Sequence, residues 1–282
     1  MATAWAALDP GKRLPQYRVK AEPPATPPEN KIHDDQVARQ LGFTAGLVPG
    51  VTVYAWMTHP VVEALGLEWL EGGSFSVRFA RPIYYGEEAT VQATVAARTA
   101  DSITIEVSAL NLAGEACATA TMGLVIGARP TPPDLAAYPE ARLPAERPLA
   151  TRQLLASLAS LGTPKLRLDE AGAFDFLSRV DESLPLYRGA SAPGHPGLYL
   201  DQANRALDQN VRVSPWIHVE SHGQHWGLCR AGESLATRGR ITRLFERKGH
   251  ELGELDLLLV SNGSRAVASI RHTAIYRLRQ AA

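Results

Sequence analysis

The sequence predicts an α+β protein made of two similar units, in each of which helices precede an antiparallel sheet. Three observations indicate this fold class. The order of helical and alternating apolar patterns occurs twice, a proline-rich stretch separates the two copies, and 282 residues are enough for two domains of ordinary size. We therefore expect an N-terminal domain over 1–127, a linker over 128–148 and a C-terminal domain over 149–282.

The first unit begins with two helical patterns. Val37 and Leu41 are four residues apart and Gly42 follows them, which predicts a short amphipathic helix. A second helix is expected from Val51 to Leu65, directly after Pro49-Gly50. The period then changes to the alternation typical of strands, which we expect over 75–79, 90–98, 102–110 and 116–125.

The second unit shows the same order of patterns. A helix is expected over 200–207, and a further helix over 149–161 in the connection between the units. Strands are expected over 216–220, 235–246, 250–260 and 266–278, with Asn262-Gly263 as a hairpin turn.

Direct residue matches suggest that the units arose by duplication. At an offset of 166 residues, Asp35, Gln36, Arg39, Leu41 and Pro49 coincide with Asp201, Gln202, Arg205, Leu207 and Pro215. At an offset of 146, Tyr85-Gly86-Glu87 falls on Ala231-Gly232-Glu233. The change of offset predicts that the second copy has lost about 20 residues of helix. Chance similarity is the alternative explanation.

Composition excludes several classes of protein. The 29 basic residues cancel the 29 acidic ones, whereas a general nucleic-acid binder needs a basic excess. The two cysteines, Cys117 and Cys229, are too few for a disulfide scaffold or a four-cysteine zinc site. The N-terminus lacks the pattern of a signal peptide, and no apolar run reaches the roughly 18 residues of a membrane span. We expect a cytoplasmic protein without a membrane partner.

One motif carries chemical information. Asn30, His33 and Asp35 are followed by Ala38, Gly42-Phe43 and Pro49-Gly50. Over about residues 29 to 51 this spacing resembles the hydratase motif of the MaoC-like enoyl-thioester hydratases. The resemblance implies a double hotdog fold, in which two antiparallel sheets each wrap a central helix. It also implies a homodimer with no cofactor.

The resemblance further implies a hydratase or dehydratase that adds or removes water at the double bond of an acyl thioester, carried by coenzyme A or by acyl-carrier protein. His33 matches the family's acid and base, and Asn30 would orient water or substrate. The amide of Gly50 matches the group that receives the carbonyl oxygen. An oriented acid or base and a preorganised oxyanion donor each lower such a barrier by roughly 3 to 5 kcal/mol.

Two positions depart from the family motif. Pro28 stands where the family has the catalytic Asp, and Pro49 stands where it has the His of a His-Gly pair. Glu29 is the candidate to replace the missing carboxylate. Glu29, Asp35 and Tyr54 are candidates for substrate binding, although Asp35 also suits the first turn of a helix and Tyr54 also suits the core.

Alternatives follow from these departures. His33 could be an ordinary residue at a helix start, and Asn30 could be a helix cap. At the level of function, a thioesterase would direct water to the carbonyl instead of the double bond. A non-catalytic thioester-binding protein would retain the pocket without the reaction, as the loss of two ionisable positions suggests.

The second unit has no such motif, since Tyr199 stands where the first unit has His33. His218, Glu220 and His222 alternate along one expected strand face, and His225 and Cys229 follow. No recognised zinc spacing is present, so we expect a pocket or interface there and no metal. A further set of cations has two possible roles, binding of phosphates or simple exposure on a solvated strand face. These are Arg78, Arg81, Arg238, Arg240 and Arg243.

Overall fold

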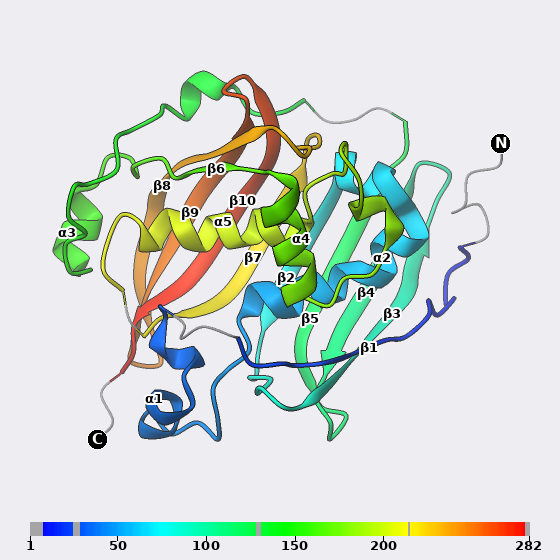
Figure 1. Cartoon of the computed structure of the whole chain (residues 1–282), viewed down its shortest axis with the longest axis horizontal. Coiled ribbons are helices and arrows are strands. Elements are labelled where there is room, and N and C mark those ends of the chain that lie inside the picture. The colour runs from blue at the N-terminus through cyan, green and yellow to red at the C-terminus, as the bar shows by residue number, and fades with distance from the viewer. Residues whose placement is uncertain (1–7, 25–28, 128–130, 214, 280–282) are drawn as a thin grey trace.

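The computed structural model describes residues 8–24, 29–127, 131–213 and 215–279, and Pro28 lies outside them. Within these ranges ten strands form one sheet, in the order β1-β3-β4-β5-β2-β7-β10-β9-β8-β6 (Figure 1). Their bounds are β1 Tyr17–Lys20, β2 Gly73–Phe79, β3 Glu88–Arg98, β4 Ser102–Leu110, β5 Ala116–Val125, β6 Lys165–Arg167, β7 Ile217–His225, β8 Ser234–Arg247, β9 His250–Ser261 and β10 Arg265–Arg277.

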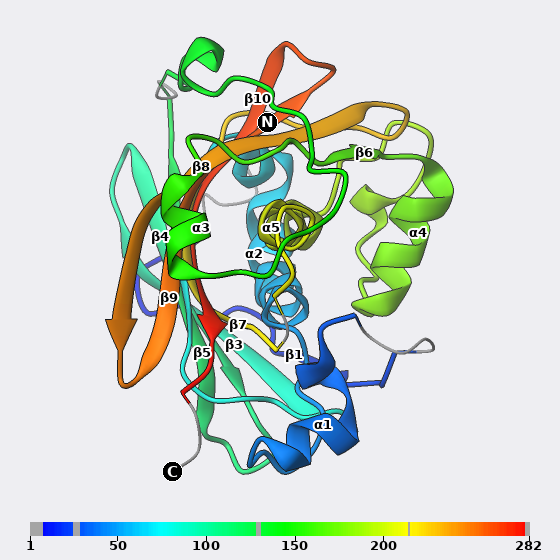
Figure 2. The ribbon, with the colours of Figure 1, turned by 90° about the vertical axis from the view of Figure 1, so that its left-hand side faces the viewer.

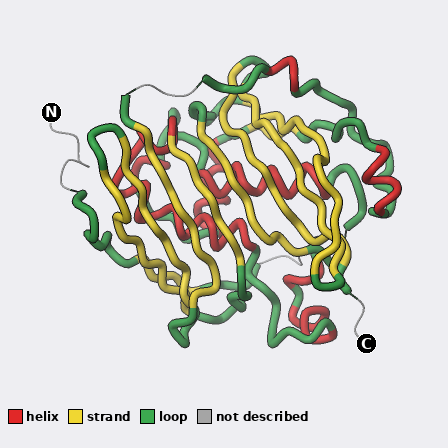
Figure 3. The backbone as a smooth tube through the Cα atoms, turned by 180° about the vertical axis from the view of Figure 1, so that it is seen from behind, coloured by secondary structure: helices red, strands yellow, loops and turns green. Residues whose placement is uncertain are grey.

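Two long helices lie on one face of this sheet, and no helix of the described residues covers the opposite face (Figures 1 and 3). They are α2, Gly50–Gly72, and α5, Pro196–Asp208, which pack against each other. Seen from the side, α4 forms a third layer outside α5 (Figure 2). The remaining helical segments are α1 Asp35–Gln40, α3 Arg152–Ser157, α4 Glu170–Arg179, η2 Lys31–His33, η3 Leu135–Ala137 and η4 Pro185–Tyr187.

The α+β class and one long helix per half are confirmed, but the expectation of two separate sheets is wrong. β2 pairs antiparallel with β7, with Phe75 opposite Gly223, so the two half-sheets are continuous. Each of these strands would otherwise present a row of unpaired amide and carbonyl groups, and their mutual pairing satisfies both rows. The main hydrophobic core likewise includes residues from both halves. The division at 127 and 149 stays a prediction.

The helix α2 has two parts. The first ends where the sequence predicts, because Gly66, directly after Leu65, has a non-helical φ of +61° and kinks the backbone, and a second helical part continues to Gly72. Most of its residues are buried against the sheet, and Tyr54 and Trp69 are among its largest fully buried side chains. No described helix is long and apolar enough to cross a membrane.

Hydrogen bonds around the helix starts support the duplication and correct its alignment. At an offset of 146, the amide of Val48 bonds Ile83 as that of Gly194 bonds Cys229, at 2.8 and 2.7 Å. The isolated bridges Leu47–Tyr84 and Pro193–Arg230 keep the same offset. The offset of 166 is wrong, because it places the short α1 on the long α5. Identities in a short polar helix arise from capping and exposure, which many helices share.

Candidate functional site

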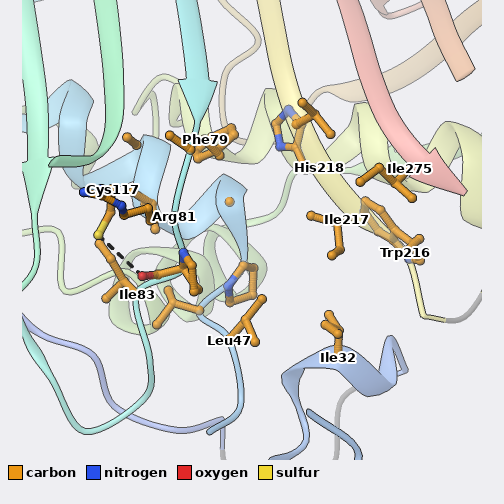
Figure 4. A pocket seen from close by; sticks show the side chains of 18 of the residues that line it. Ile32, Leu47, Phe79, Arg81, Ile83, Cys117, Trp216, Ile217, His218 and Ile275 are labelled. Carbon is orange, nitrogen blue, oxygen red and sulfur yellow. Dashed lines mark hydrogen bonds between the residues drawn. The ribbon is translucent and has the colours of Figure 1, made fainter. Parts of the chain in front are cut away.

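A cavity of about 480 Å³ lies where the first turn of α2 meets the end of β2 and the start of β7 (Figure 4). Three predicted residues, Asn30, His33 and Gly50, line it together. Apolar side chains such as Ile32, Leu47 and Ile83 supply much of the wall. None of the described residues that line the cavity is Asp or Glu. Its chemistry therefore rests on imidazoles, amides and cations.

His33 ends the short segment η2 and is held in one orientation. Its Nδ1–H donates to the carbonyl of Leu47 at 2.7 Å, which leaves Nε2 with a free lone pair. Asn30 Nδ2 donates to that Nε2 across a long 3.4 Å contact. Burial lowers the pKa of His33, and the hydrogen bond to Leu47 opposes this only in part. The ring is thus a neutral base near pH 7.

Asn30 has a positioning role that the sequence did not predict. Its Nδ2 donates to the carbonyl of Trp216 at 2.9 Å, and its Oδ1 accepts from the amide of Trp216 at 3.3 Å. The same oxygen caps η2 by accepting from Ile32 at 3.4 Å. Asn30 therefore connects the motif of the first half to the segment that leads into β7. Its side-chain hydrogen bonds orient His33 and this segment.

Gly50 begins α2, and no side chain caps this helix because the N-cap residue is Pro49. The first amides to bond back to Pro49 are those of Thr52 and Val53, at 2.9 and 3.1 Å. The amides of Gly50 and Val51 therefore precede the helix's own hydrogen bonds and can donate to a ligand oxygen. A Cβ on Gly50 would lie 3.1 Å from His218 Nδ1, so only glycine leaves this space open.

The other three predicted site residues lie away from the cavity lining. Asp35 accepts from the amide of Gly46 at 2.7 Å and pairs with Arg39, so it organises the loop after α1. Tyr54 is fully buried, with its ring centroid 4.8 Å from that of Phe75. Glu29 is exposed, and the side chain of His33 hydrogen bonds Asn30 and Leu47 instead of this carboxylate.

The carboxylate of Glu29 faces a different group. Burial raises the pKa of Asp208, and the neighbouring Glu29 carboxylate raises it further. The described hydrogen-bond partners of His33 are Asn30 and the Leu47 carbonyl, and neither is a carboxylate. Among the described residues, none therefore replaces the Asp that the motif lacks.

A second imidazole in the cavity, His218 of β7, was not assigned to this site from the sequence. It is 6% exposed, and its ring lies 4.6 Å from that of Phe79 (Figure 4). The expected alternation with Glu220 and His222 is wrong at this point. β7 has an irregularity where Thr273 pairs with Glu220 but Ala274 pairs with His218, so Val219 is bulged out. The bulge places His218 and Ser221 on the same buried face.

The histidines of β7 do not converge on one point among the described residues. Within the described residues, no group of three or more His, Cys, Asp or Glu side chains is arranged to hold an ion. His225 is buried beside Trp69, with ring centroids 5.0 Å apart, and burial lowers its pKa to about 4.

Cys117 lines the cavity, where its thiol lies 3.4 Å from the carbonyl of Pro82 (Figure 4).

Cations lie at the cavity from both halves of the chain. Of the arginines considered from the sequence, Arg78 and Arg81 line it. Arg247 and Lys248, at the β8–β9 turn, join them and were missed, because nothing local in the sequence indicates where this hairpin points. The remaining arginines are engaged elsewhere: Arg238 with Glu140, Arg240 with Asp256, and Arg243 over the Phe245 ring.

Comparison with known proteins shows what the fold resembles. A protein named as a MaoC domain dehydratase from Chloroflexus aurantiacus superposes with a TM-score of 0.66 at 11% identity, covering 96% of both chains. A conserved Mycobacterium tuberculosis protein with a double hotdog fold gives 0.62 at 14% identity, covering 96% of this chain and 97% of that one. A protein named as an oleoyl thioesterase from Lactobacillus plantarum gives 0.55 at 13% identity, covering 99% and 100%.

These similarities establish the double hotdog fold, because they extend over nearly the whole of each chain. No family model matches the sequence, and no curated protein matches it. At such low identity the neighbours define the architecture, and the activity has to be argued from the cavity itself.

Proposed function

We propose that this protein is a hydro-lyase that adds water to, or removes it from, the double bond of an α,β-unsaturated acyl thioester. One observation carries the proposal. His33, with Nδ1 fixed on Leu47 and Nε2 held only by a long contact from Asn30, lines the same cavity as the uncapped amides at the start of α2. A base and an oxyanion donor in one enclosed space are the two parts that this reaction needs.

The hydration follows from this arrangement. A water molecule replaces the long contact from Asn30 and gives a proton to His33 Nε2, while its oxygen bonds to the β carbon of the substrate. The electrons of the double bond move toward the thioester oxygen, which accepts from the amide of Gly50. The imidazolium of His33 then returns the proton to the α carbon. Dehydration is the same sequence in reverse.

The surroundings suit this charge flow. Negative charge builds on the thioester oxygen, and the start of a helix carries partial positive charge. No carboxylate lies among the described lining residues to oppose it. Arg78, Arg81, Arg247 and Lys248 complement a substrate carrier that bears phosphates, as coenzyme A and acyl-carrier protein both do.

The test compares the wild-type protein with His33→Ala on short- and medium-chain α,β-unsaturated acyl-CoA thioesters. Hydration is followed by loss of the absorbance of the conjugated double bond. We expect His33→Ala to lower kcat/KM by about a hundredfold or more. His222→Ala, a change to a partly exposed histidine outside the cavity lining, is the matched control and should keep the wild-type rate.

The pH dependence adds a second check. Because burial lowers the pKa of His33, the base stays unprotonated into mildly acidic solution. The acid limb of the wild-type rate profile should therefore fall below about pH 6.5, the ordinary value for histidine. Equal hydration rates for wild type and His33→Ala would remove His33 from the mechanism.

A thioesterase is the second candidate, since the neighbours include proteins named as thioesterases. The same oxyanion site would then stabilise attack of water on the carbonyl. Release of free thiol from saturated acyl-CoA, measured with a thiol reagent, distinguishes this reaction from hydration. Binding of acyl-CoA without turnover of either substrate would favour a non-catalytic role.

A homodimer stays a prediction, which sedimentation equilibrium tests.

A further inference from the structure

His218 has a polar atom that the proposed mechanism leaves unused. Its Nδ1 is buried and has no hydrogen-bond partner among the residues that the structure describes. This atom lies 3.1 Å from where a Cβ on Gly50 would be, so it faces the first turn of α2. A buried ring nitrogen without a partner costs free energy unless a ligand uses it. His218 and Gly50 both line the cavity, which is where such a ligand would lie.

The other side of the ring is held by a buried chain of hydrogen bonds. His218 Nε2 lies 2.8 Å from Ser221 Oγ, which lies 3.0 Å from His272 Nδ1. All three side chains are at most 6% exposed, and the two imidazole rings are 4.3 Å apart. One hydroxyl therefore couples the tautomers of two rings. When His272 Nδ1–H donates to Ser221, the serine donates to His218 Nε2, and the proton of His218 is on Nδ1.

The ring is also kept neutral. Burial lowers the pKa of His218 well below its ordinary value, the nearby His272 lowers it further, and a backbone hydrogen bond at Glu220 opposes this. Burial lowers the pKa of His272 to about 3. A neutral imidazole at a helix N-terminus can polarise a carbonyl as a hydrogen-bond donor, as the neutral histidine of triosephosphate isomerase does.

We propose that His218, through Nδ1–H, is a second hydrogen-bond donor to the thioester oxygen beside the amide of Gly50, and that Ser221 and His272 are positioning residues that hold its proton on that nitrogen. The inference rests on the proposed function, whose reaction develops charge on this oxygen. It gives the second half of the chain a direct part in a site whose motif belongs to the first half. The bulge at Val219 is what aims the ring at α2.

Two substitutions at the same position separate the relevant atoms. In His218→Asn, the amide nitrogen takes the place of Nδ1 and the link to Ser221 is lost. In His218→Gln, the amide nitrogen takes the place of Nε2, so the link to Ser221 is kept and the donor toward Gly50 is lost. We expect His218→Gln to lower kcat by about a hundredfold with little change in KM, and His218→Asn to stay within about tenfold of wild type.

A variant of the positioning residue tests the coupling. Ser221→Ala removes the hydroxyl that relates the two rings, so we expect an intermediate fall in kcat without loss of the fold. Nitrogen-15 NMR of the histidine side chains gives a readout independent of turnover. We expect His218 to be protonated on Nδ1 in the wild-type protein and to show mixed tautomers in Ser221→Ala.

The outcomes separate this inference from the proposed function. If wild type hydrates the thioester, His33→Ala does not, and His218→Gln matches wild type, the inference fails and the proposed function stands. If wild type turns over no thioester, the proposed function fails. In either case, a wild-type His218 protonated on Nε2 would overturn the assignment of the donor.

Discussion

The two central helices start in equivalent places in the two halves, yet their N-termini differ. The start of α2 opens on the 480 Å³ cavity and has no side-chain cap. At the start of α5, the N-cap residue is His195, whose Nδ1 accepts from the amide of Gly197 at 3.0 Å. At the offset of 146, His195 occupies the position of Pro49. The capping residue therefore decides whether the helix amides are free for a ligand or used internally.

The surroundings of α5 complete this closure. His195 lies within 5.4 Å, ring to ring, of both Phe176 and Tyr187, which come from α4 and η4. Its Nε2–H donates to Glu182 at 3.4 Å, and His59 of α2 donates to the same carboxylate at 2.9 Å. The segment that carries α4 thus packs against the start of α5, whereas the equivalent space at the start of α2 is the open cavity. The start of α2 is left open on the cavity, and the equivalent start of α5 is closed by its own side chains.

The largest expected effect comes from removing the carboxylate that closes the second half. Burial raises the pKa of Glu182, but hydrogen bonds from His195 and His59 outweigh it and bring the pKa to about 2. Glu182→Ala leaves two buried imidazoles and the amide of Leu184 without their acceptor. We expect a loss of about 3 to 5 kcal/mol in the free energy of unfolding, measured by urea denaturation.

Glu63→Ala is the control for this change, because Glu63 is exposed on α2 and makes none of these contacts. It should change stability by no more than about 0.5 kcal/mol. A loss in Glu182→Ala as small as that of the control would show that the closure around α5 contributes little stability.

The second prediction concerns the strand residue beside each helix start. Phe79 lies 3.4 Å from the Cβ position at Gly50, and at the same offset the second half has His225, whose pKa burial lowers to about 4. Because the unfolded chain binds this proton near pH 6.5, stability falls as the pH drops from about 6.5 to 4. The loss for this one group is about 3 kcal/mol.

His225→Phe makes the second half resemble the first at this position and removes that titration. Urea unfolding at about pH 7 and about pH 5 should show a smaller acid loss for the variant than for wild type. The same acid loss in both proteins would mean that other groups, and not His225, dominate the pH dependence of stability.

The smallest expected effect comes from filling the open helix start. In Gly50→Ala, the new methyl group lies 3.1 Å from His218 Nδ1, so the ring must move by a few tenths of an ångström. We expect kcat/KM for thioester hydration to fall about tenfold, while the free energy of unfolding changes by less than about 1 kcal/mol. A Gly50→Ala variant with wild-type kinetics would show that this space is not where the substrate oxygen binds.

Much of this site could be predicted from the sequence because its first part is local. Asn30, His33 and Gly50 come from one motif of about twenty residues, and the structure brings all three to one cavity. Glu29 and Asp35, from the same motif, and Tyr54, just after it, were also proposed but do not line the cavity. Spacing along a chain does not say which side of a loop or helix faces a pocket. That side is fixed only when the two halves of the chain pack together.

Periodicity and capping act over a few residues, so the α+β class, the helix in each half and the position of the motif follow from the local sequence. The packed fold is needed to see that β2 joins β7 in one sheet, that a bulge turns His218 toward α2, and that Glu182 bridges His59 and His195. These features pair groups far apart in the chain, and such pairs form because a buried strand edge or polar atom must find a partner.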